Sequence, residues 1–218
     1  HHATMGNRVL VFGYLAGAAM FNFSFMALVI WRLVLRLREQ ARRDQLTGLP
    51  NRRALQDELM REWQRLQRGT GGFAVLALDL DHFKRINDEH GHLVGDEVLM
   101  QVGRRLSAAL RGTDVVARVG GEEFAALVAD GHADAAVAAA ERLRLAVAAS
   151  PFDLPAGPLA LTVSVGVAVA DVQDASLRQL LLRADRALYR AKAEGRNRVV
   201  LDAPGPTPVH AAPAAPAA

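Results

Sequence analysis

The chain has 218 residues, 51% of them hydrophobic, so it can bury a full core, and disorder throughout the chain is excluded. It contains no cysteine, which excludes disulfide frameworks, thiolate metal sites and cysteine nucleophiles. The net charge is +3, but six of the 26 basic and one of the 23 acidic residues lie in residues 1–43, leaving twenty basic and twenty-two acidic residues in 44–202. The basic excess therefore indicates a cluster that flanks a membrane rather than a patch for a nucleic acid polymer.

The first predicted element is an uncharged segment at residues 9–31. As a helix rising ~1.5 Å per residue it would cross the ~30 Å hydrocarbon core of a bilayer, so we expect a transmembrane helix. A secretory signal and a buried core helix are the alternatives, but arginines follow directly from Arg32, and a core helix normally carries a polar stripe. Five arginines follow the span and one precedes it, so the positive-inside rule places the downstream domain in the cytoplasm.

Residues 1–8, which begin with two histidines, are interpreted as an N-terminal remnant.

Residues 32–43 are expected to continue helically as a basic linker. The spacing of Ile30, Leu33 and Leu37 is that of a short parallel coiled coil, and a solvated basic linker explains it as well. At the other end of the chain, residues 203–218 are rich in Pro and Ala and have too little apolar bulk to pack, which predicts a disordered tail.

Strand-like and helix-like segments alternate from residue 51 to residue 202. The run at 73–81 is almost continuously apolar, as in a buried central strand, and Gly120-Gly121 joins two apolar runs as in a tight hairpin. The expected helices are 51–68, 95–111, 132–149 and 176–194, and the expected strands are 73–81, 114–119, 123–129, 161–169 and 198–202. This pattern predicts an α/β fold with a central five-stranded sheet flanked by helices.

Acidic side chains gather at the ends of two of these strands. Asp79 and Asp81 end the central strand, where a spacing of two puts them on one face, and Glu122 and Glu123 stand at the hairpin tip. A calcium loop beginning at Asp79 is excluded, because its sixth position lacks the required Gly and its twelfth lacks the bidentate Glu. If the hairpin packs beside the central strand, one glutamate can converge with Asp79 on a hard cation while the other points to the opposite face. Oxygen ligands favour Mg²⁺ or Mn²⁺, and this arrangement is typical of phosphoryl or nucleotidyl transfer; a structural acid cluster is the alternative.

The hairpin tip and four further blocks make a recognisable set. Their sequences are GGEEF at 120–124, DQLTGLPNRR at 44–53, DLDHFKRIND at 79–88, GHLVGDEVL at 91–99 and AKAEGRNRV at 191–199. In these blocks the chain resembles the GGDEF family of diguanylate cyclases, as a GGEEF variant with a membrane anchor. The resemblance covers residues 44–202 and implies a palm-like nucleotidyl cyclase domain at the inner (cytoplasmic) membrane of a bacterial-type cell.

The resemblance also implies an activity and a metal site. A homodimer would condense two GTP molecules into cyclic di-GMP and release pyrophosphate, with one GTP held by each domain. Asp79 and Glu123 would coordinate Mg²⁺ (or Mn²⁺) together with the backbone carbonyl of Leu80. Glu122 would lie near the ribose 3′-hydroxyl and help to deprotonate it.

Further residues are assigned to the nucleotide by the same resemblance. Asn87 and Asp96 would hydrogen-bond guanine, which suits an amide and a carboxylate facing a carbonyl and N–H donors. A cap on a helix that begins at Asp96 is the alternative for that residue. Phe83 and Lys84 would approach the phosphates through their backbone.

Two basic positions and one short motif complete the assignments. Lys192 and Arg196 would neutralise the terminal phosphates, although a favourable place at a helix C-terminus explains them as well. Arg111 and Asp114 match the RxxD product-inhibition site, with a surface ion pair as the alternative.

The expected partners are GTP, cyclic di-GMP as product and inhibitor, a second copy of the chain, and a membrane through residues 9–31; no nucleic acid polymer is expected. Two other functions stay open on the sequence. One is a catalytically silent receptor for GTP or cyclic di-GMP. The other is a related cyclase that uses ATP or makes a mixed dinucleotide, which depends on Asp96, because adenine lacks the N–H donor pair of guanine.

Overall fold

The computed structural model describes residues 17, 20–33, 42–129, 131–154 and 157–202. Residues 1–42 and 43–218 form two separate units. In the first, residues 20–33 are helical, and within the described part of the chain no helix has the length and apolar character needed to cross a membrane. The predicted span at 9–31 and the predicted linker at 32–43 lie partly outside the described residues, and the predicted tail at 203–218 lies wholly outside them.

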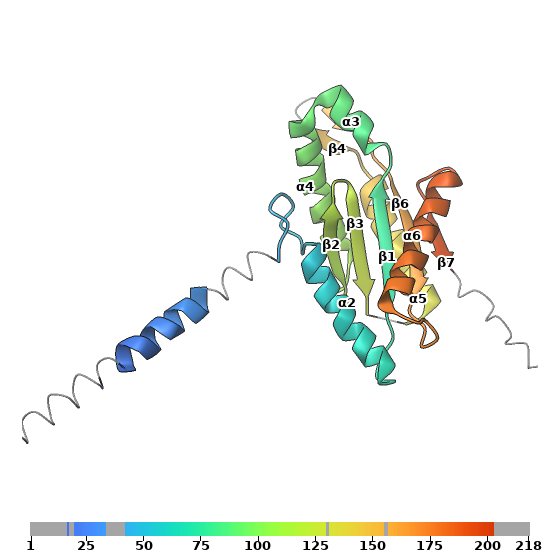
Figure 1. Ribbon diagram of the computed structural model, residues 1–218. Helices are drawn as coiled ribbons and strands as arrows, with labels where there is room; N and C mark the ends of the chain where they lie inside the picture. The colour runs from blue at the N-terminus through green and yellow to red at the C-terminus, as the bar shows by residue number, and fades with distance from the viewer. Residues whose placement is uncertain (1–16, 18–19, 34–41, 130, 155–156, 203–218) are drawn as a thin grey trace, which may run out of the picture. The chain divides into compact units, whose positions relative to one another are not determined.

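The second unit is built on a five-stranded sheet in the order β2-β3-β1-β6-β7 (Figure 1). Its strands are β1 (Ala74–Leu80), β2 (Val115–Gly120), β3 (Glu123–Val128), β6 (Val163–Val169) and β7 (Val199–Asp202). β1 lies at the centre, antiparallel to β3 and to β6, while β7 runs parallel to β6. Every residue of β1 is buried, as its nearly continuous apolar sequence predicts.

Helices cover both faces of this sheet. They are α2 (Arg52–Gln67), α3 (Phe83–His90), α4 (His92–Ala109), α5 (Ala133–Ala148) and α6 (Leu177–Ala193). Leu76 and Leu78 pack in the core with α3, α4 and α5, whereas Val75 and Ala77 pack in the core with α2 and α6. The predicted α/β fold with a central five-stranded sheet flanked by helices is therefore confirmed.

Two elements differ from the sequence-based expectation. The predicted helix at 95–111 begins earlier, at His92. It is preceded by a helix that was not predicted, α3. Only Phe83 and Ile86 of α3 are buried, too few to show a helical apolar pattern in the sequence. A second, two-stranded sheet of β4 (Phe152–Leu154) and β5 (Gly157–Leu159) was also not predicted. Its strands have three residues each, too few to show an alternating pattern.

The ends of the predicted helices follow local capping rules. The side chain of Asn51 accepts a hydrogen bond from Ala54 N at the start of α2 (3.0 Å). The hydroxyl of Ser176 accepts one from Gln179 N at the start of α6 (3.3 Å). These caps explain why both helices begin within one or two residues of their predicted starts.

Close packing fixes α6 against β6. A Cβ at position 166 would overlap the backbone of Ala184 and Leu188, so only Gly166 lets the helix approach the strand this closely. The position of α6 therefore depends on a residue with no side chain.

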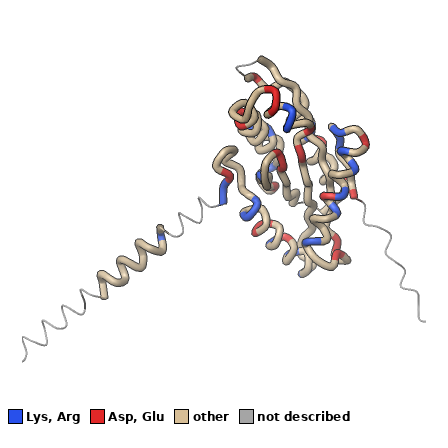
Figure 2. Tube along the Cα trace, turned by 45° about the horizontal axis from the view of Figure 1, so that its top comes forward, with Lys and Arg blue, Asp and Glu red and all other residues tan. Residues whose placement is uncertain are grey.

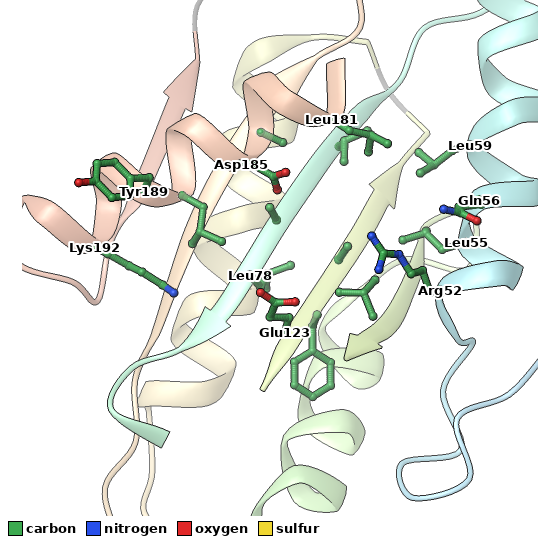
Figure 3. A pocket seen from close by; sticks show the side chains of 17 residues that line it. Arg52, Leu55, Gln56, Leu59, Leu78, Glu123, Leu181, Asp185, Tyr189 and Lys192 are labelled. Carbon is green, nitrogen blue, oxygen red and sulfur yellow. The ribbon is translucent and has the colours of Figure 1, made fainter. Parts of the chain in front are cut away.

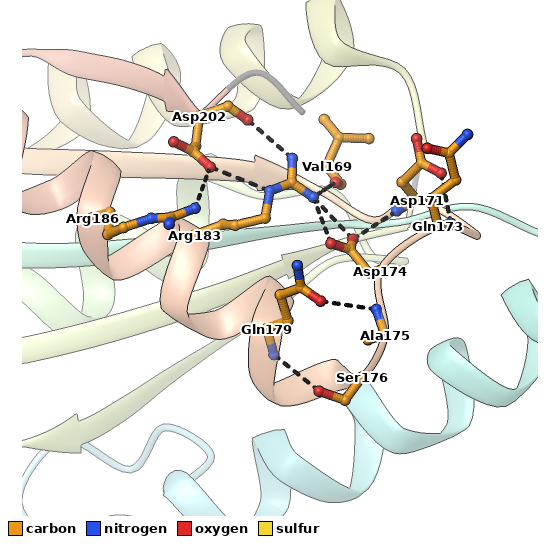
Figure 4. Close-up of polar contacts among 10 residues, drawn as sticks. All are labelled: Val169, Asp171, Gln173, Asp174, Ala175, Ser176, Gln179, Arg183, Arg186 and Asp202. Carbon is orange, nitrogen blue, oxygen red and sulfur yellow. Dashed lines mark hydrogen bonds and ion pairs between the residues drawn. The ribbon is translucent and has the colours of Figure 1, made fainter. Parts of the chain in front are cut away.

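A buried arginine ties α6 to two neighbouring segments. Acidic and basic residues are interspersed along the domain (Figure 2). Arg183 is only 4% exposed and forms ion pairs with two of the acids. Its guanidinium donates to both carboxylate oxygens of Asp174 (3.1 and 2.9 Å) and to the carbonyl of Val169 (3.1 Å) (Figure 4). It also donates to the side chain (3.2 Å) and the carbonyl (3.1 Å) of Asp202 at the end of β7. Arg183 thus holds the β6–α6 loop and the last strand on one helix.

We expect Arg183→Met to lower the free energy of unfolding by about 3–5 kcal/mol, because it leaves the Asp174 carboxylate buried without a counter-charge. Urea unfolding followed by circular dichroism measures this loss. The control Arg186→Met removes an exposed contact to the same Asp202 and should cost less than about 1 kcal/mol. Equal, small losses in both variants would contradict a stabilising role for the buried network.

Candidate active site

The two acids of the predicted metal site lie opposite each other on neighbouring strands. Asp79 and Glu123 are Cα partners in the antiparallel pairing of β1 and β3. Side chains at such partner positions share a face, with Cβ atoms about 4.5–5.5 Å apart. Asp79 follows Val75 and Ala77 in alternation, so this face is the one covered by α2 and α6. The structure therefore brings two carboxylates together where a strand and a hairpin tip meet.

A lysine completes this group of charges. The Nζ of Lys192, in the last turn of α6, is 2.7 Å from Oδ2 of Asp79. Figure 3 shows the Lys192 side chain extending from α6 toward Glu123. The structure thus places a cation from α6 against the carboxylate that ends β1. Arg196, the second basic residue expected at the phosphates, follows α6 and is exposed.

Glu122 stands in the turn just before β3 and is half-buried. Its backbone carbonyl accepts a hydrogen bond from Leu80 N (3.3 Å), which ties the turn to the end of β1. Burial raises the pKa of the Glu122 carboxyl, and the negative charge of Asp79 raises it further, while Lys192 opposes the shift. Glu122 is therefore a stronger base than an ordinary exposed glutamate.

The atoms here that could coordinate a metal ion are carboxylate and carbonyl oxygens, which hard divalent cations prefer. Among the described residues, no three His, Cys, Asp or Glu side chains form a metal-binding group. A pair of carboxylates is nevertheless enough for Mg²⁺, which typically takes one or two from the protein and completes its shell with substrate phosphates and water. Asp79, Glu123 and the adjacent Leu80 carbonyl fit such a site.

Asp81 has a structural role that the sequence reasoning did not predict. Its carboxylate accepts hydrogen bonds from the hydroxyls of Thr162 (2.6 Å) and Ser164 (2.7 Å) and from the backbone N–H of Asn197 (3.1 Å). The last bond anchors the loop after α6, next to Arg196. The sequence shows only an acidic residue just past a strand expected to be buried, and this pattern does not indicate which residues bind its carboxylate.

Asn87 and Asp96, the two residues expected to bind guanine, lie on the adjacent helices α3 and α4. A Cβ at position 95 would overlap the side-chain oxygen of Asn87, so Gly95, the residue before Asp96, provides the space that this amide occupies. Helix α4 begins at His92 with Gly91 as its N-cap. The alternative in which Asp96 caps the helix is therefore wrong.

The residues expected near the phosphates begin α3. Phe83 is buried and Lys84 is exposed, and both belong to the first turn of this helix. N–H groups in a first turn have no partner within the helix, and they attract anions. The position of both backbones is thus compatible with phosphate binding.

The RxxD pair lies between α4 and β2. Asp114 accepts hydrogen bonds from the backbone N–H of Arg111 (3.4 Å) and of Ala129 (3.2 Å). No ion pair between the side chains of Arg111 and Asp114 is seen in the described structure, so the surface ion pair considered from the sequence is not formed. The Arg111 side chain is left exposed.

Arg118 connects the hairpin tip to the beginning of the domain, which the sequence reasoning also missed. Its guanidinium donates to the carbonyl of Gly121 (3.0 Å) and to the carboxylate of Asp44 (3.1 Å). Asp44 in turn accepts hydrogen bonds from the backbone and the hydroxyl of Thr47 (2.9 and 2.7 Å). Although burial raises the pKa of Asp44, the hydrogen bonds from Thr47 and Arg118 outweigh it and leave the pKa below its ordinary value of 3.8.

A cleft of about 450 Å³ lies between α2 and α6, over the sheet (Figure 3). Its walls are mainly apolar, with Leu55 and Leu59 on one side and Leu181 and Leu188 on the other. Glu123 and Lys192 also line it. The acid–base corner therefore borders open space instead of being sealed by side chains.

Comparison with known proteins shows which family has this sequence and fold. A family model described as "Diguanylate cyclase, GGDEF domain" matches residues 41–198. The chain is 46% identical over 162 residues to diguanylate cyclase DgcP of Pseudomonas aeruginosa, covering 74% of this chain and 24% of the relative. It is 42% identical over 164 residues to the response regulator PleD of Caulobacter vibrioides, covering 74% of this chain and 36% of the relative. The chain thus spans about a quarter to a third of these two relatives.

A solved structure agrees with the fold. The coiled coil and GGDEF domain of DgcB from Caulobacter crescentus, in complex with c-di-GMP, matches with a TM-score of 0.76 at 31% identity, covering 84% of this chain and 97% of that one.

We expect Asp44→Asn to lower the free energy of unfolding at pH 7 by about 1 kcal/mol. Because the pKa of Asp44 is depressed in the folded state, the stabilisation by its carboxylate is complete above pH 3.8 and is lost as the pH falls through the lower folded value. Urea unfolding at pH 7, 5 and 3 should show an equal deficit at the first two values and a smaller one at the third.

The control for this series is Asp88→Asn, which changes an exposed acid and should shift stability by less than about 0.5 kcal/mol throughout. A deficit of Asp44→Asn that is the same at pH 3 as at pH 7 would contradict the depressed pKa.

Proposed function

The chain belongs to the GGDEF diguanylate cyclase family, and from this premise we propose that it condenses two GTP molecules into cyclic di-GMP and two pyrophosphates. The observation that carries the proposal is the pairing of Asp79 with Glu123 across β1 and β3, with Lys192 at the same corner. These three residues supply two carboxylates for a metal ion and one cation for phosphate. A structural acid cluster would not need the open cleft beside them.

Asp79, Glu123 and the carbonyl of Leu80 would hold Mg²⁺ (or Mn²⁺). When bound, the ion supplies charge neutralisation and orientation at the triphosphate. Lys192 and Arg196 would neutralise the terminal phosphates as pyrophosphate leaves. The first turn of α3, with Phe83 and Lys84, would donate backbone N–H groups to the phosphates.

Glu122 would accept the proton of the ribose 3′-hydroxyl. The 3′ oxygen then bonds to the α-phosphorus of the second GTP, and the bond from that phosphorus to the pyrophosphate oxygen breaks. The same step from the 3′-hydroxyl of the second GTP to the α-phosphorus of the first closes the ring and releases the second pyrophosphate. The raised pKa of Glu122 supports this role, since a general base is most effective when its pKa approaches the working pH.

Asn87 and Asp96 would select guanine. A carboxylate accepts the N1 and N2 hydrogens that guanine offers and adenine lacks, and the amide can pair with the remaining edge. The space that Gly95 leaves for Asn87 supports this assignment, because it lets the amide lie against α4 at the residue that precedes Asp96.

The proposal extends to assembly, attachment and regulation. Each GTP would be held by one domain, so a homodimer brings the 3′-hydroxyl of one to the α-phosphate of the other. The uncharged run at 9–31 supports attachment to the inner membrane, and the five arginines that follow it support a domain in the cytoplasm. Arg111 and Asp114 would bind cyclic di-GMP as inhibitor, supported by the exposed side chain of Arg111 and by the c-di-GMP complex of DgcB.

The decisive experiment incubates the full chain with GTP and Mg²⁺ and separates the nucleotides by liquid chromatography. We expect cyclic di-GMP and pyrophosphate from the wild type and a loss of about a hundredfold or more in rate for Glu123→Ala, since metal stabilisation contributes several kcal/mol. The control Glu62→Ala removes a glutamate of α2 that pairs with Arg65 and does not line the cleft, and it should keep its rate. If the wild type binds GTP without forming product, the chain is a receptor, and the proposed activity is wrong.

Specificity is tested by Asp96→Asn. Loss of a charged hydrogen-bond acceptor should reduce the preference for GTP over ATP in kcat/KM by roughly tenfold to a hundredfold. The neighbouring substitution Glu97→Gln removes the same charge from α4 and should leave the preference unchanged. An unaltered preference in Asp96→Asn would refute the assignment of this residue to guanine.

A further inference from the structure

The ion pair between Lys192 and Asp79 raises a question about how the metal enters. The same carboxylate that is proposed to bind a divalent cation already has an ammonium group 2.7 Å away. A metal ion on Asp79 would compete with the Lys192 ammonium for one negative charge, and the two cations would repel each other at this short distance. Binding of the metal ion therefore weakens the ion pair and favours release of the lysine.

The surroundings allow the lysine to be the group that moves. Its side chain is 35% exposed, against 10% for Asp79, and it borders the open cleft between α2 and α6. The helix that carries it is fixed by Gly166 and Arg183, so movement is confined to the four-carbon stem. Asp79 itself lies on the central strand and cannot shift without disturbing the sheet.

The amino-acid composition adds an independent observation. Of the 26 basic residues in the chain, 24 are arginines, and Lys192 is one of only two lysines. An arginine at this position would bind the carboxylate through two parallel hydrogen bonds and would be harder to displace. A lysine makes a compact, single-point contact on a flexible stem, which suits a contact that must be broken and remade.

We infer that Lys192 is an exchangeable counter-ion. It neutralises Asp79 while the site is empty and turns to the triphosphate when the metal–nucleotide complex binds. The inference rests on the proposed function, in which that complex binds at Asp79.

A coupling between metal and nucleotide follows from this exchange. A metal ion alone must displace the ammonium from Asp79 and offers it no new partner. A metal ion that arrives with nucleotide supplies phosphate oxygens for Lys192 to bind. The two ligands therefore favour each other's binding, and the free ion binds weakly.

Mn²⁺ binding to the nucleotide-free full chain, followed by electron paramagnetic resonance, tests the first half of the exchange. Lys192→Gln should bind Mn²⁺ about threefold to tenfold more tightly than the wild type. Lys192→Arg should bind it no more tightly than the wild type. The matched control Arg196→Gln removes a neighbouring positive charge without breaking the ion pair and should stay within about twofold.

The complex of Mn²⁺ with 3′-deoxy-GTP, which lacks the reacting hydroxyl, tests the second half. Lys192→Gln should bind this complex more weakly than the wild type, opposite to its effect on the free ion. A merely structural defect would weaken both. Free Mn²⁺ affinity in Lys192→Gln that equals or falls below that of the wild type would overturn the inference.

A measurement on the unmutated protein gives a second check. Lysine-selective isotope labelling yields signals from only two side chains, Lys84 and Lys192, which Lys84→Arg distinguishes. Adding Mg²⁺ with 3′-deoxy-GTP should move the Lys192 signal, and an unmoved signal would count against the exchange. These readouts need no turnover, so a catalytically silent protein would still show the exchange while failing the product assay.

Discussion

The antiparallel register between β1 and β3 decides where the chemistry of this domain can occur. It sets Asp79 opposite Glu123 on the face covered by α2 and α6. A slip of one residue would move Glu123 to the other face and bury a charge among the leucines of the opposite core. The buried partners Leu78 and Phe124, one step along the same pairing, oppose that slip, and Arg118 fixes the hairpin tip through the carbonyl of Gly121.

The second requirement is the position of α6, which delivers Lys192 to the end of β1. Gly166 lets the helix touch β6, and Arg183 binds it to the loop before it and to the last strand. Two different forces thus act on one helix, close packing in its middle and a buried ion network along its side. With the helix in this position, the Lys192 side chain in its last turn is long enough to reach Asp79.

The first residues of the domain are linked to the site formed by Asp79, Glu123 and Lys192. Asp44 and Arg118 join the first residues of the domain to the hairpin tip, and Asp81 joins the end of β1 to the loop after α6. Through Arg118, residue 44 is thus linked by two hydrogen bonds to the carbonyl of Gly121, which precedes Glu122.

The sequence by itself determined the elements with strong periodicity and the hairpin with its two glutamates, because these are local patterns. The register that sets Glu123 opposite Asp79 came from the packing of the hairpin beside β1. The sequence did not reveal α3, whose apolar contacts are only two, or the three-residue strands β4 and β5. Only the tertiary structure decided which charges meet: Lys192 with Asp79, Arg118 with Asp44, and Asp81 with Asn197. These partners are far apart along the chain, and helix packing sets their distance, which no local pattern of residues records.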